Sequence, residues 1–417
     1  MEHLLSHSAQ IIKPYPLREL KNAIGHMDLI FLSSSNHSPD ASPNDEILEI
    51  IGRLVKEHAA GAMFSVRQEL KKEAIRILDE RNIPSASENI AVINNAQRAL
   101  ELIGKTLLDP GDVVLLENPA QSGAIVCFSN LSAQIESVAA DKEGIDIEKL
   151  EKQIRQLKKE GKKIKLLYTM PTFANPTSIT LAEDRRRTLA ELAEREDFLI
   201  LENDLFADMW FTGEDSFPFK PITSFTSERT IYLSGFAGII APGLRSIYLH
   251  GPELIIRKIE YAAESADLTA GSIEHRTILE LIRSGSLETS MKKARSIYWQ
   301  QCRSMLEALE AYMPDNVQWH SPKGGFYLWM ELPHKYKTVD LLNKAIHQGV
   351  SFVPGLVFDP AEKENNFLRL SFTAESIKRI KMGVAFLANA IRFWDIKEKV
   401  PWALGDFCRR CDDVSRE

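Results

Sequence analysis

The chain is predicted to be an α/β protein with a mostly parallel sheet and a smaller α+β unit beside it. Three observations lead to this prediction. Strand-like and helix-like segments alternate between about residues 90 and 250. A second group of short strands follows a long helical stretch. The length of 417 residues also exceeds what one hydrophobic core usually supports.

The first 43 residues are expected to form an arm with scattered proline and serine. Asn44 or Asp45 would then cap a helix, because the segment that follows, EILEIIGRLVKEHA, has apolar residues at helical spacing. Residues 67–82 are predicted to form another amphipathic helix.

From residue 90 onward, short apolar runs are predicted to be buried strands, and the segments between them to be helices of roughly 10–15 residues. The predicted strands read IAVI, VVLLE, IESVAA, KIKLLYTM, FLILEND, TIYLSGF and SIYLHGP. Ligands of such sheets bind at the carboxyl ends of the strands. The loops after VVLLE, KLLYTM, FLILE and TIYL are therefore the expected site.

Residues 252–315 look helical, and short strands and helices alternate after them. The expected division is an arm (1–43), a large α/β domain (44–290), a small C-terminal α+β domain (291–396) and a polar tail (397–417). The helix that starts near residue 44 could belong to either domain.

Composition excludes several classes of protein. Hydrophobic residues make up 44% and the net charge is −7, so the chain is not expected to be disordered. The mildly acidic balance argues against a basic nucleic-acid-binding face. No signal peptide or membrane-spanning run is evident, and four cysteines fit a reducing compartment. The predicted location is the cytoplasm.

Cys408 and Cys411 form a lone C-x-x-C in the tail. A metal site would need two more ligands, and the nearest histidine in the sequence is the distant His347. Exposed, inert thiols are the favoured interpretation, and no metal is expected.

Six segments occur in a characteristic order: LLDPGDVVLLENP, PTFANPTS, FLILENDL, TIYLSGFAGIIAPGLRSIYL, GGFYLWMELP and VPGLVFDPAEKENNFLRLSFT. This series resembles the class I/II aminotransferases of pyridoxal-phosphate (PLP) fold type I, over about residues 28–390. It looks most similar to the aminotransferase domain that is fused to winged-helix regulators. The resemblance implies a dimer with its sites at the subunit interface.

In this family a lysine forms a Schiff base with the cofactor and moves protons at the substrate. It lies in a Ser-Phe-Ser-Lys turn before Ala-Pro-Gly-Leu-Arg. This chain reads Gly235-Phe236-Ala237-Gly238 in the turn, and without a gap the lysine position is Gly238. Glycine has no amine, so the covalent bond to the cofactor cannot form there.

Other positions also depart from the family pattern. The carboxylate that holds the ring-nitrogen proton falls at Asn203, and the ring-stacking aromatic falls at Gln121. The phosphate loop falls at Asn95 and Ala96, with Asn95 in place of glycine. A tyrosine that contacts the cofactor hydroxyl is replaced by Leu205 or Phe206, and the glycine of the Asn-Pro-Thr-Gly turn is Ser178.

Three functional positions are retained. Asn175 matches the residue that meets the ring hydroxyl, Arg245 the phosphate-binding arginine, and Arg369 the arginine that binds the substrate carboxylate. The alternative is that both arginines are inherited and bind no ligand, and that Asn175 only caps a turn. Asp204 is either a structural carboxylate or a redeployed acid/base, with the structural role favoured, and Glu202 is expected to be structural.

Whether the chain is an enzyme is left open. The leading hypothesis is a protein repurposed in amino-acid or amine-derived metabolism that binds an amino acid, a keto acid or non-covalent PLP or pyridoxamine phosphate (PMP). It could also bind no cofactor. A second hypothesis is a non-catalytic partner of an active aminotransferase or a metabolite sensor. A third is an aminotransferase that uses non-covalent PMP. Direct DNA binding is not expected, because only about 28 residues precede the matched region.

Overall fold

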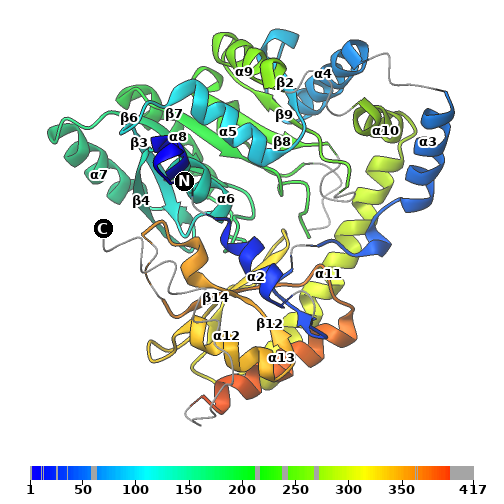
Figure 1. Ribbon diagram of the computed structural model, residues 1–417, viewed down its shortest axis with the longest axis vertical. Coiled ribbons are helices and arrows are strands. Elements are labelled where there is room, and N and C mark those ends of the chain that lie inside the picture. Colours follow the sequence, from blue (N-terminus) through cyan, green and yellow to red (C-terminus); the bar gives the residue numbers. More distant parts are fainter. Residues whose placement is uncertain are drawn as a thin grey trace.

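The computed structural model describes residues 2–10, 12, 14–24, 27–34, 36–57, 63–211, 217–236, 243–266, 272–361, 363 and 365–394. The larger of its sheets has the strand order β2-β9-β8-β7-β6-β3-β4-β5 (Figure 1). The strands are Ile90–Ile93 (β2), Val113–Asn118 (β3), Gln134–Asp141 (β4), Gly144–Ile145 (β5), Ile164–Thr169 (β6), Leu199–Asn203 (β7), Thr230–Gly235 (β8) and Ile247–His250 (β9).

The centre of this sheet is parallel, from β4 through β3, β6 and β7 to β8. β9 runs antiparallel to both β2 and β8, and β5 forms a hairpin with β4. The predicted α/β class is therefore confirmed. The loops that were expected to carry the site follow β3, β6, β7 and β8, whose carboxyl ends lie along one edge.

Both faces of the sheet are buried because consecutive positions on its central strands are apolar, and successive side chains point to opposite faces. In β3, Val114 and Leu116 face one layer of helices, and Val113 and Leu115 face the other. The first layer consists of α5 (Ala96–Leu107), α6 (Ser122–Asn130) and α9 (Glu253–Ala266). The second consists of α7 (Ile147–Lys159) and α8 (Glu183–Glu196).

A second sheet is antiparallel and has the order β10-β11-β14-β13. Its strands are Gln318–Trp319 (β10), Tyr327–Glu331 (β11), Val353–Pro354 (β13) and Phe367–Ser371 (β14). α12 (Thr338–His347) and α13 (Ile377–Arg392) belong to the same part of the chain. The long α11 (Ser286–Tyr312) packs on α13 and runs along the side of the molecule toward α10 (Ser272–Arg283) and α3 (Asn44–Lys56) (Figure 1).

The N-terminal arm is attached to the second sheet region. β1 (Ile30–Phe31) pairs in parallel with β12 (Val350–Ser351). Before β1 come α1 (His7–Gln10) and α2 (Pro16–Ile24), and α2 is held by two buried apolar side chains, Leu20 and Ile24. Figure 1 shows α2 in the region between the two sheets.

The predicted cap of the helix near residue 44 is wrong. α3 begins at Asn44 itself, and Pro43, which has no side-chain acceptor, takes the capping position. The Asn44 amide instead donates to the carbonyl oxygen of Pro39 (3.2 Å). Asp45 lies in the first turn, where its charge interacts favourably with the helix dipole. The next helix, α4 (Met63–Glu80), covers most of the predicted range 67–82.

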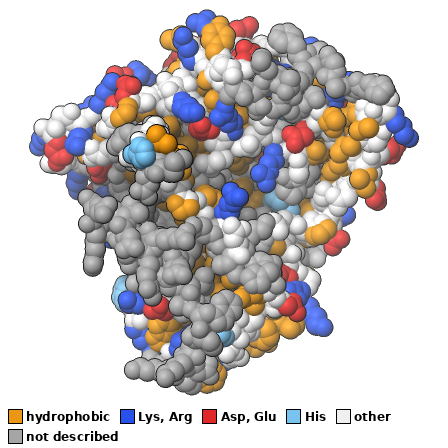
Figure 2. All heavy atoms as spheres, viewed as in Figure 1, with side chains coloured by type: hydrophobic (Ala, Val, Ile, Leu, Met, Phe, Trp, Pro, Cys, Tyr) orange, Lys and Arg blue, Asp and Glu red, His pale blue; other side chains and the backbone are white. Residues whose placement is uncertain are grey.

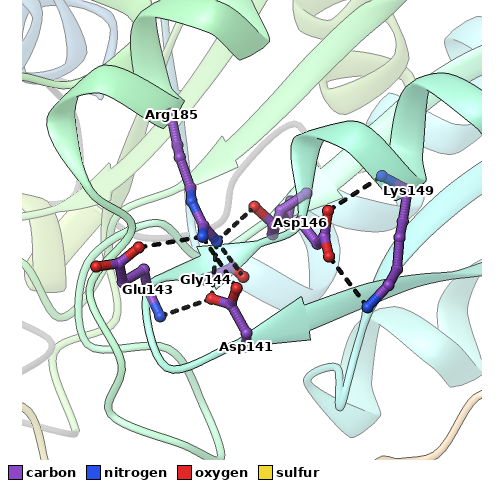
Figure 3. Close-up of polar contacts among 7 residues, drawn as sticks. Asp141, Glu143, Gly144, Asp146, Lys149 and Arg185 are labelled. Atoms are coloured by element: carbon purple, nitrogen blue, oxygen red, sulfur yellow. Dashed lines mark hydrogen bonds and ion pairs between the residues drawn. The ribbon is translucent and has the colours of Figure 1, made fainter.

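Arg185 of α8 holds the β4–β5 hairpin at the edge of the large sheet (Figure 3). Its guanidinium donates to both carboxylate oxygens of Asp141 (2.7 and 2.9 Å), to Glu143 (3.1 Å) and to the carbonyl oxygen of Gly144 (3.1 Å). The hydrogen bonds from Arg185 lower the pKa of Asp141. Asp146 then caps α7, so this short edge is anchored at both ends.

Charged side chains of both signs are interspersed over the described surface of one face (Figure 2). None of the helices in the described ranges is long and apolar enough to cross a membrane. Within the same ranges, no group of three His, Cys, Asp or Glu side chains is arranged to hold a metal ion.

Candidate functional site

Two of the predicted site residues, Gln121 and Asn203, are joined through Tyr168 at the carboxyl edge of the large sheet. The Tyr168 hydroxyl donates to Oε1 of Gln121 (2.6 Å) and accepts from Nδ2 of Asn203 (2.9 Å). Burial raises the pKa of Tyr168, so its hydroxyl stays protonated. The two residues at the expected positions of the stacking ring and the carboxylate are thus each hydrogen-bonded to the same tyrosine hydroxyl.

Asn203 is fully buried at the end of β7. Its amide donates to Tyr168, and its Oδ1 accepts from the backbone N–H of Leu205 (3.3 Å). A side-chain amide carries no charge, so this position supplies no carboxylate to stabilise a protonated ring nitrogen.

Asp204, the residue that follows β7, contacts a different group of side chains. Its Oδ2 accepts from the hydroxyl of Tyr232 (3.0 Å), and the same hydroxyl accepts from Arg81. Arg81 also forms a bidentate pair with Asp208 (2.7 and 2.9 Å). Burial raises the pKa of Asp204. These contacts favour the structural role that was expected for Asp204.

Glu202, also fully buried, holds a neighbouring turn. Its carboxylate accepts from the backbone N–H groups of Ile222 (2.7 Å) and Thr223 (2.9 Å), and from the Thr223 hydroxyl (2.7 Å). Burial raises the pKa of Glu202 to about 7. These bonds agree with the structural role predicted for it.

Asn95 caps α5, where the family pattern predicts the phosphate loop. Its Oδ1 accepts from the backbone N–H of Arg98 (2.8 Å), and Ala96 is the first residue of the helix. A phosphate at this end of a helix would use the same free N–H groups. The side chain of Asn95 therefore competes for one of the donors that a glycine would leave open.

Asn175 and Arg369 come together between the two sheets. Nη1 of Arg369 donates to Oδ1 of Asn175 (2.9 Å), and Nη2 donates to the carbonyl oxygen of Ser33 (3.3 Å). The guanidinium also lies over the rings of Tyr327 (4.0 Å to the centroid) and Phe358 (5.0 Å).

Arg369 is 1% exposed, and its Nε has no hydrogen-bond partner. No described carboxylate lies within ion-pair distance of it. Burial accordingly lowers the pKa of Arg369. A buried cation without an anion is costly, so the arrangement favours a bound carboxylate.

A cavity of about 760 Å³ adjoins Arg369 and is large enough for a small organic acid. The residues that line it come from the arm, from β1 and the loop after it, from the segment just before β9, and from β14 and the residues that follow it. They include Tyr15, Leu17, Ser33, His37, Arg245 and Arg369. Burial lowers the pKa of His37 to about 4, so His37 is neutral at pH 7.

The replaced residues near this cavity serve packing and turn formation. Phe206 packs against Phe326 (4.8 Å between centroids) and Tyr327 (5.9 Å) and offers no hydroxyl. Ser178 has the positive φ of 54° that the family's glycine would adopt easily. The Ser178 hydroxyl donates to the carbonyl oxygen of Tyr327 (2.7 Å), which helps to offset the strain.

Two residues of this region were missed in the sequence. Tyr168 lies within the apolar run KLLYT, where an aromatic residue is typical of a core strand. Tyr15 precedes α2, far from every recognised segment, and only the folded structure brings it to the cavity. Gly238, Cys408 and Cys411 lie outside the described residues.

The geometry can be compared with known proteins. The family model for aminotransferase class I and II matches residues 57–386. The chain belongs to the class I/II aminotransferase family. It is 34% identical to the aromatic-amino-acid aminotransferase 1 of Thermococcus litoralis, and the match covers 94% of each chain. It is 25% identical to the transcriptional regulator YdfD of Bacillus subtilis, over 90% of this chain and 77% of that protein.

A solved structure of this aminotransferase fold shares the architecture. It is the kynurenine aminotransferase of Pyrococcus horikoshii, in complex with PMP, kynurenine and its product. The TM-score is 0.87 and the identity 32%, over 95% of this chain and 98% of that one. Membership in the aminotransferase family implies the use of PLP or PMP.

The described residues fit the covalently held cofactor of an aminotransferase poorly. Asn203 brings no charge to the ring nitrogen, Gln121 brings no ring, and Asn95 caps the helix that would hold the phosphate. Arg369, in contrast, is held by Asn175 and keeps an Nε–H group without a hydrogen-bond partner. The site is better suited to a carboxylate than to an aminotransferase cofactor in its usual mode.

Proposed function

We propose that this chain is an aminotransferase-like protein that binds a small carboxylic acid, such as an amino acid or a keto acid, without Schiff-base chemistry. Its role would lie in amino-acid or amine-derived metabolism. The observation that carries the proposal is Arg369, which is buried, has an Nε without a hydrogen-bond partner, lies beside a cavity and forms no ion pair with a described carboxylate. The described carboxylate that lines the same cavity, Glu375, is paired with Arg379. An arginine in such a place binds carboxylates well, because its planar donors match the two oxygens.

The sequence adds the second part of the argument. The family's lysine position is Gly238, and the neighbouring positions Gly235 and Ala237 have lost the hydroxyl groups of the family's turn. The changes at Asn203 and Gln121 accompany this loss. A knockout of one residue would leave the other positions unchanged, so the pattern supports a repurposed site. Any PLP or PMP would then be held non-covalently.

A chemical trapping experiment, combined with a binding measurement, tests this proposal directly. The purified chain is mixed with PLP, treated with borohydride and analysed by mass spectrometry of its peptides. The expected result is no reduced PLP adduct at a stoichiometric level on any lysine. In parallel, calorimetry should detect binding of 3-phenylpropanoate, an unreactive carboxylate. A stoichiometric adduct on one lysine would restore a conventional aminotransferase and overturn the proposal.

A second candidate function is amino-group transfer from non-covalently held PMP. The similarity to an aromatic-amino-acid aminotransferase over 94% of the chain favours it, because it extends through both sheets. The test is to follow the conversion of a keto acid to its amino acid in the presence of PMP. Multiple turnovers with added PMP would support this candidate over a purely binding role.

The assembly proposed is a cytoplasmic homodimer, or a pair with a lysine-bearing aminotransferase in which this chain acts as a non-catalytic partner or metabolite sensor. Large apolar side chains support an interface: Leu48 and Val55 on α3 are 69% and 57% exposed. Figure 2 shows hydrophobic side chains on the side of the molecule where α3 and α11 lie. Sedimentation of the pure chain, alone and with such an aminotransferase, distinguishes the two assemblies.

A further inference from the structure

A second cavity lies between the large-sheet region and the second sheet. Its volume is about 640 Å³, and none of its described lining residues also lines the cavity beside Arg369. The loops after β3 and β6 and the β4–β5 hairpin form one side of it, and residues of the second sheet form the other. A space of this size holds a small organic molecule. The proposed carboxylate site at Arg369 makes no use of it.

The second sheet gives this cavity an aromatic wall. The rings of Trp329 in β11 and Phe367 in β14 are stacked, with centroids 5.5 Å apart and planes 4° from parallel. Trp329 also packs in a T-shaped arrangement against Phe358 (5.7 Å between centroids). The stack is therefore held in place by a neighbouring ring. Aromatic rings of this kind attract cations as well as apolar groups.

The side of the cavity that belongs to the large-sheet region is largely apolar and adjoins the loop that holds Arg369. Its Ala174 and Thr177 lie on either side of Asn175, which accepts the hydrogen bond from Arg369. A molecule in this cavity would therefore lie beside that loop without contacting the arginine's own cavity. The apolar residues on this side are Pro119, Ala140, Met170, Ala174, Ile179 and Leu181.

Carboxyl groups outnumber cationic groups in the cavity. Asp141 is already paired with Arg185 in the β4–β5 hairpin (Figure 3). The one described cationic residue of the lining, Lys142, is exposed, and burial lowers the pKa of His320, so His320 is neutral at pH 7. The balance favours a cationic ligand over an anionic one. The charged residues that line the cavity are Glu117, Asp141, Lys142, Glu331 and Asp359.

Glu331 is the carboxylate best placed to hold such a cation. It is half-buried at the end of β11 and pairs with Phe367 of β14, so its side chain lies on the same face of the sheet as the stacked rings. Among the described residues, none forms a hydrogen bond or an ion pair with the Glu331 side chain. A carboxylate beside aromatic rings can hold an ammonium group by a charge-assisted hydrogen bond and by cation–π attraction together.

We propose that this cavity binds an organic amine, whose ammonium group pairs with Glu331 and whose apolar body packs against the stacked rings of Trp329 and Phe367. Asp359, a further carboxylate of the lining, disfavours a ligand that also carries a carboxylate, so the site takes amines in preference to amino acids. The site is distinct from the one proposed at Arg369 and takes a ligand of opposite charge. It does not depend on carboxylate binding there.

The experiment measures binding by calorimetry with the full chain and two probes of equal size. One is 2-phenylethylamine, which is a cation at pH 7, and the other is 2-phenylethanol, which is neutral. The variants are Glu331→Gln, which removes the charge and keeps the shape, and Trp329→Leu, which removes the ring. The matched controls are Glu148→Gln, on the exposed surface of α7, and Trp299→Leu, which changes a tryptophan of α11 that is 43% exposed.

The unmodified chain should bind the amine about tenfold or more tightly than the alcohol, because only the amine pairs with a carboxylate. Glu331→Gln should weaken amine binding about fivefold or more and leave alcohol binding within about twofold. Trp329→Leu should weaken the binding of both probes, because both use the aromatic wall. Each control should match the unmodified chain within about twofold for both probes.

Several outcomes would overturn the inference. One is equal binding of the amine and the alcohol, or no binding of the amine, by the unmodified chain. Another is an unchanged amine affinity in Glu331→Gln, or the same loss in Glu148→Gln, since the effect would then come from the net charge of the protein. Should Trp329→Leu fail to fold, Glu331→Gln and its control still decide the matter, because the carboxamide replaces a half-buried carboxylate of nearly the same shape.

Discussion

The carboxamide oxygen of Asn175 accepts a hydrogen bond of 2.9 Å from the guanidinium of Arg369. The two residues are 194 positions apart in the sequence. Asn175 lies in the loop after β6 of the large sheet, and Arg369 lies in β14 of the second sheet. This bond orients a buried cation whose Nε has no partner. Both residues match functional positions of the family pattern in the sequence, and the fold brings them into contact.

The first prediction concerns this pair. Arg369→Lys should weaken the binding of 3-phenylpropanoate at least tenfold, because an ammonium group cannot make the paired hydrogen bonds of a guanidinium. Asn175→Ala should weaken it less, because the arginine remains but loses one orienting partner. Calorimetry measures both effects. The control is Arg229→Lys, which changes an exposed arginine paired with Asp197; an equal loss in that variant would contradict the assignment.

The second prediction tests the position of the missing lysine. Gly238→Lys should form a PLP adduct that borohydride fixes on residue 238, whereas the unmodified chain should form none. Adding Asn203→Asp should raise the fraction that reacts, because a carboxylate would stabilise a protonated ring nitrogen. Peptide mass spectrometry locates the adduct. If Gly238→Lys reacts no more than Gly52→Lys, a lysine on α3, the alignment at residue 238 is wrong.

A third prediction concerns the buried ionic group beside the site. Arg81→Met should destabilise the fold by about 3–5 kcal/mol, because Asp208 and Asp204 would lose the cation that compensates their buried charge. Arg76→Met is the control: Arg76 lies on α4, is 59% exposed in its side chain and should change stability by less than about 1 kcal/mol. Urea unfolding of both variants measures the difference. Similar losses in the two variants would show that the buried pair adds nothing.

The order of most strands and helices between residues 90 and 250 could be predicted because, apart from the two-residue β5, the strands are runs of 4 to 8 residues rich in apolar side chains. Burial on both faces requires such runs in a parallel sheet, so the local pattern carries the fold class. The antiparallel direction of β9 and the capping of α3 by Pro43 could not be predicted. Strand direction is decided by tertiary packing. Asn44 and Asp45 are both typical capping residues, so the sequence pattern did not indicate that α3 already begins at Asn44.

Some residues of the candidate site could likewise be predicted from the sequence, and others could not. Asn175 and Arg369 could be selected because each lies in a recognisable motif. Tyr168 could not, because its hydrogen bonds to Gln121 and Asn203 depend on three separate strand ends. Tyr15 could not either, because its partner Ser122 is 107 positions away and no sequence pattern connects them. Motifs thus indicate the residues whose roles are inherited, while contacts particular to this chain appear only in the fold.

The fourth prediction concerns close packing between the two sheets. A Cβ at Gly324 would lie 2.4 Å from the carbonyl oxygen of Met209 and 2.3 Å from the ring of Phe173, so Gly324→Ala should destabilise the fold by about 3 kcal/mol or more. At Gly52, within α3, a Cβ would meet nothing within 4 Å. Gly52→Ala should therefore stabilise the chain by up to about 1 kcal/mol through helix propensity. Thermal unfolding of both variants gives the comparison, and a shift of the same sign would contradict the packing argument.

The last prediction concerns Glu117 at the end of β3. Its carboxyl accepts from the Thr169 hydroxyl (2.8 Å) and from the backbone N–H of Met170 (3.0 Å), and burial raises its pKa from 4.5 to about 7. The folded protein therefore holds a proton on Glu117 more tightly than the unfolded chain does. This contribution to stability is complete below pH 4.5 and is lost as the pH rises to about 7.

The expected size of that loss is roughly 3 kcal/mol, at 1.36 kcal/mol for each pH unit between the two pKa values. Glu117→Gln should remove the dependence, since an amide does not titrate in this range. Urea unfolding at pH 5, 6 and 7 should therefore show the stability of the unmodified chain falling relative to that of Glu117→Gln. Glu148→Gln, on the exposed surface of α7, should run parallel to the unmodified chain. A constant difference between Glu117→Gln and the unmodified chain would mean that Glu117 is already ionised at pH 5 and that burial is offset by its two donors.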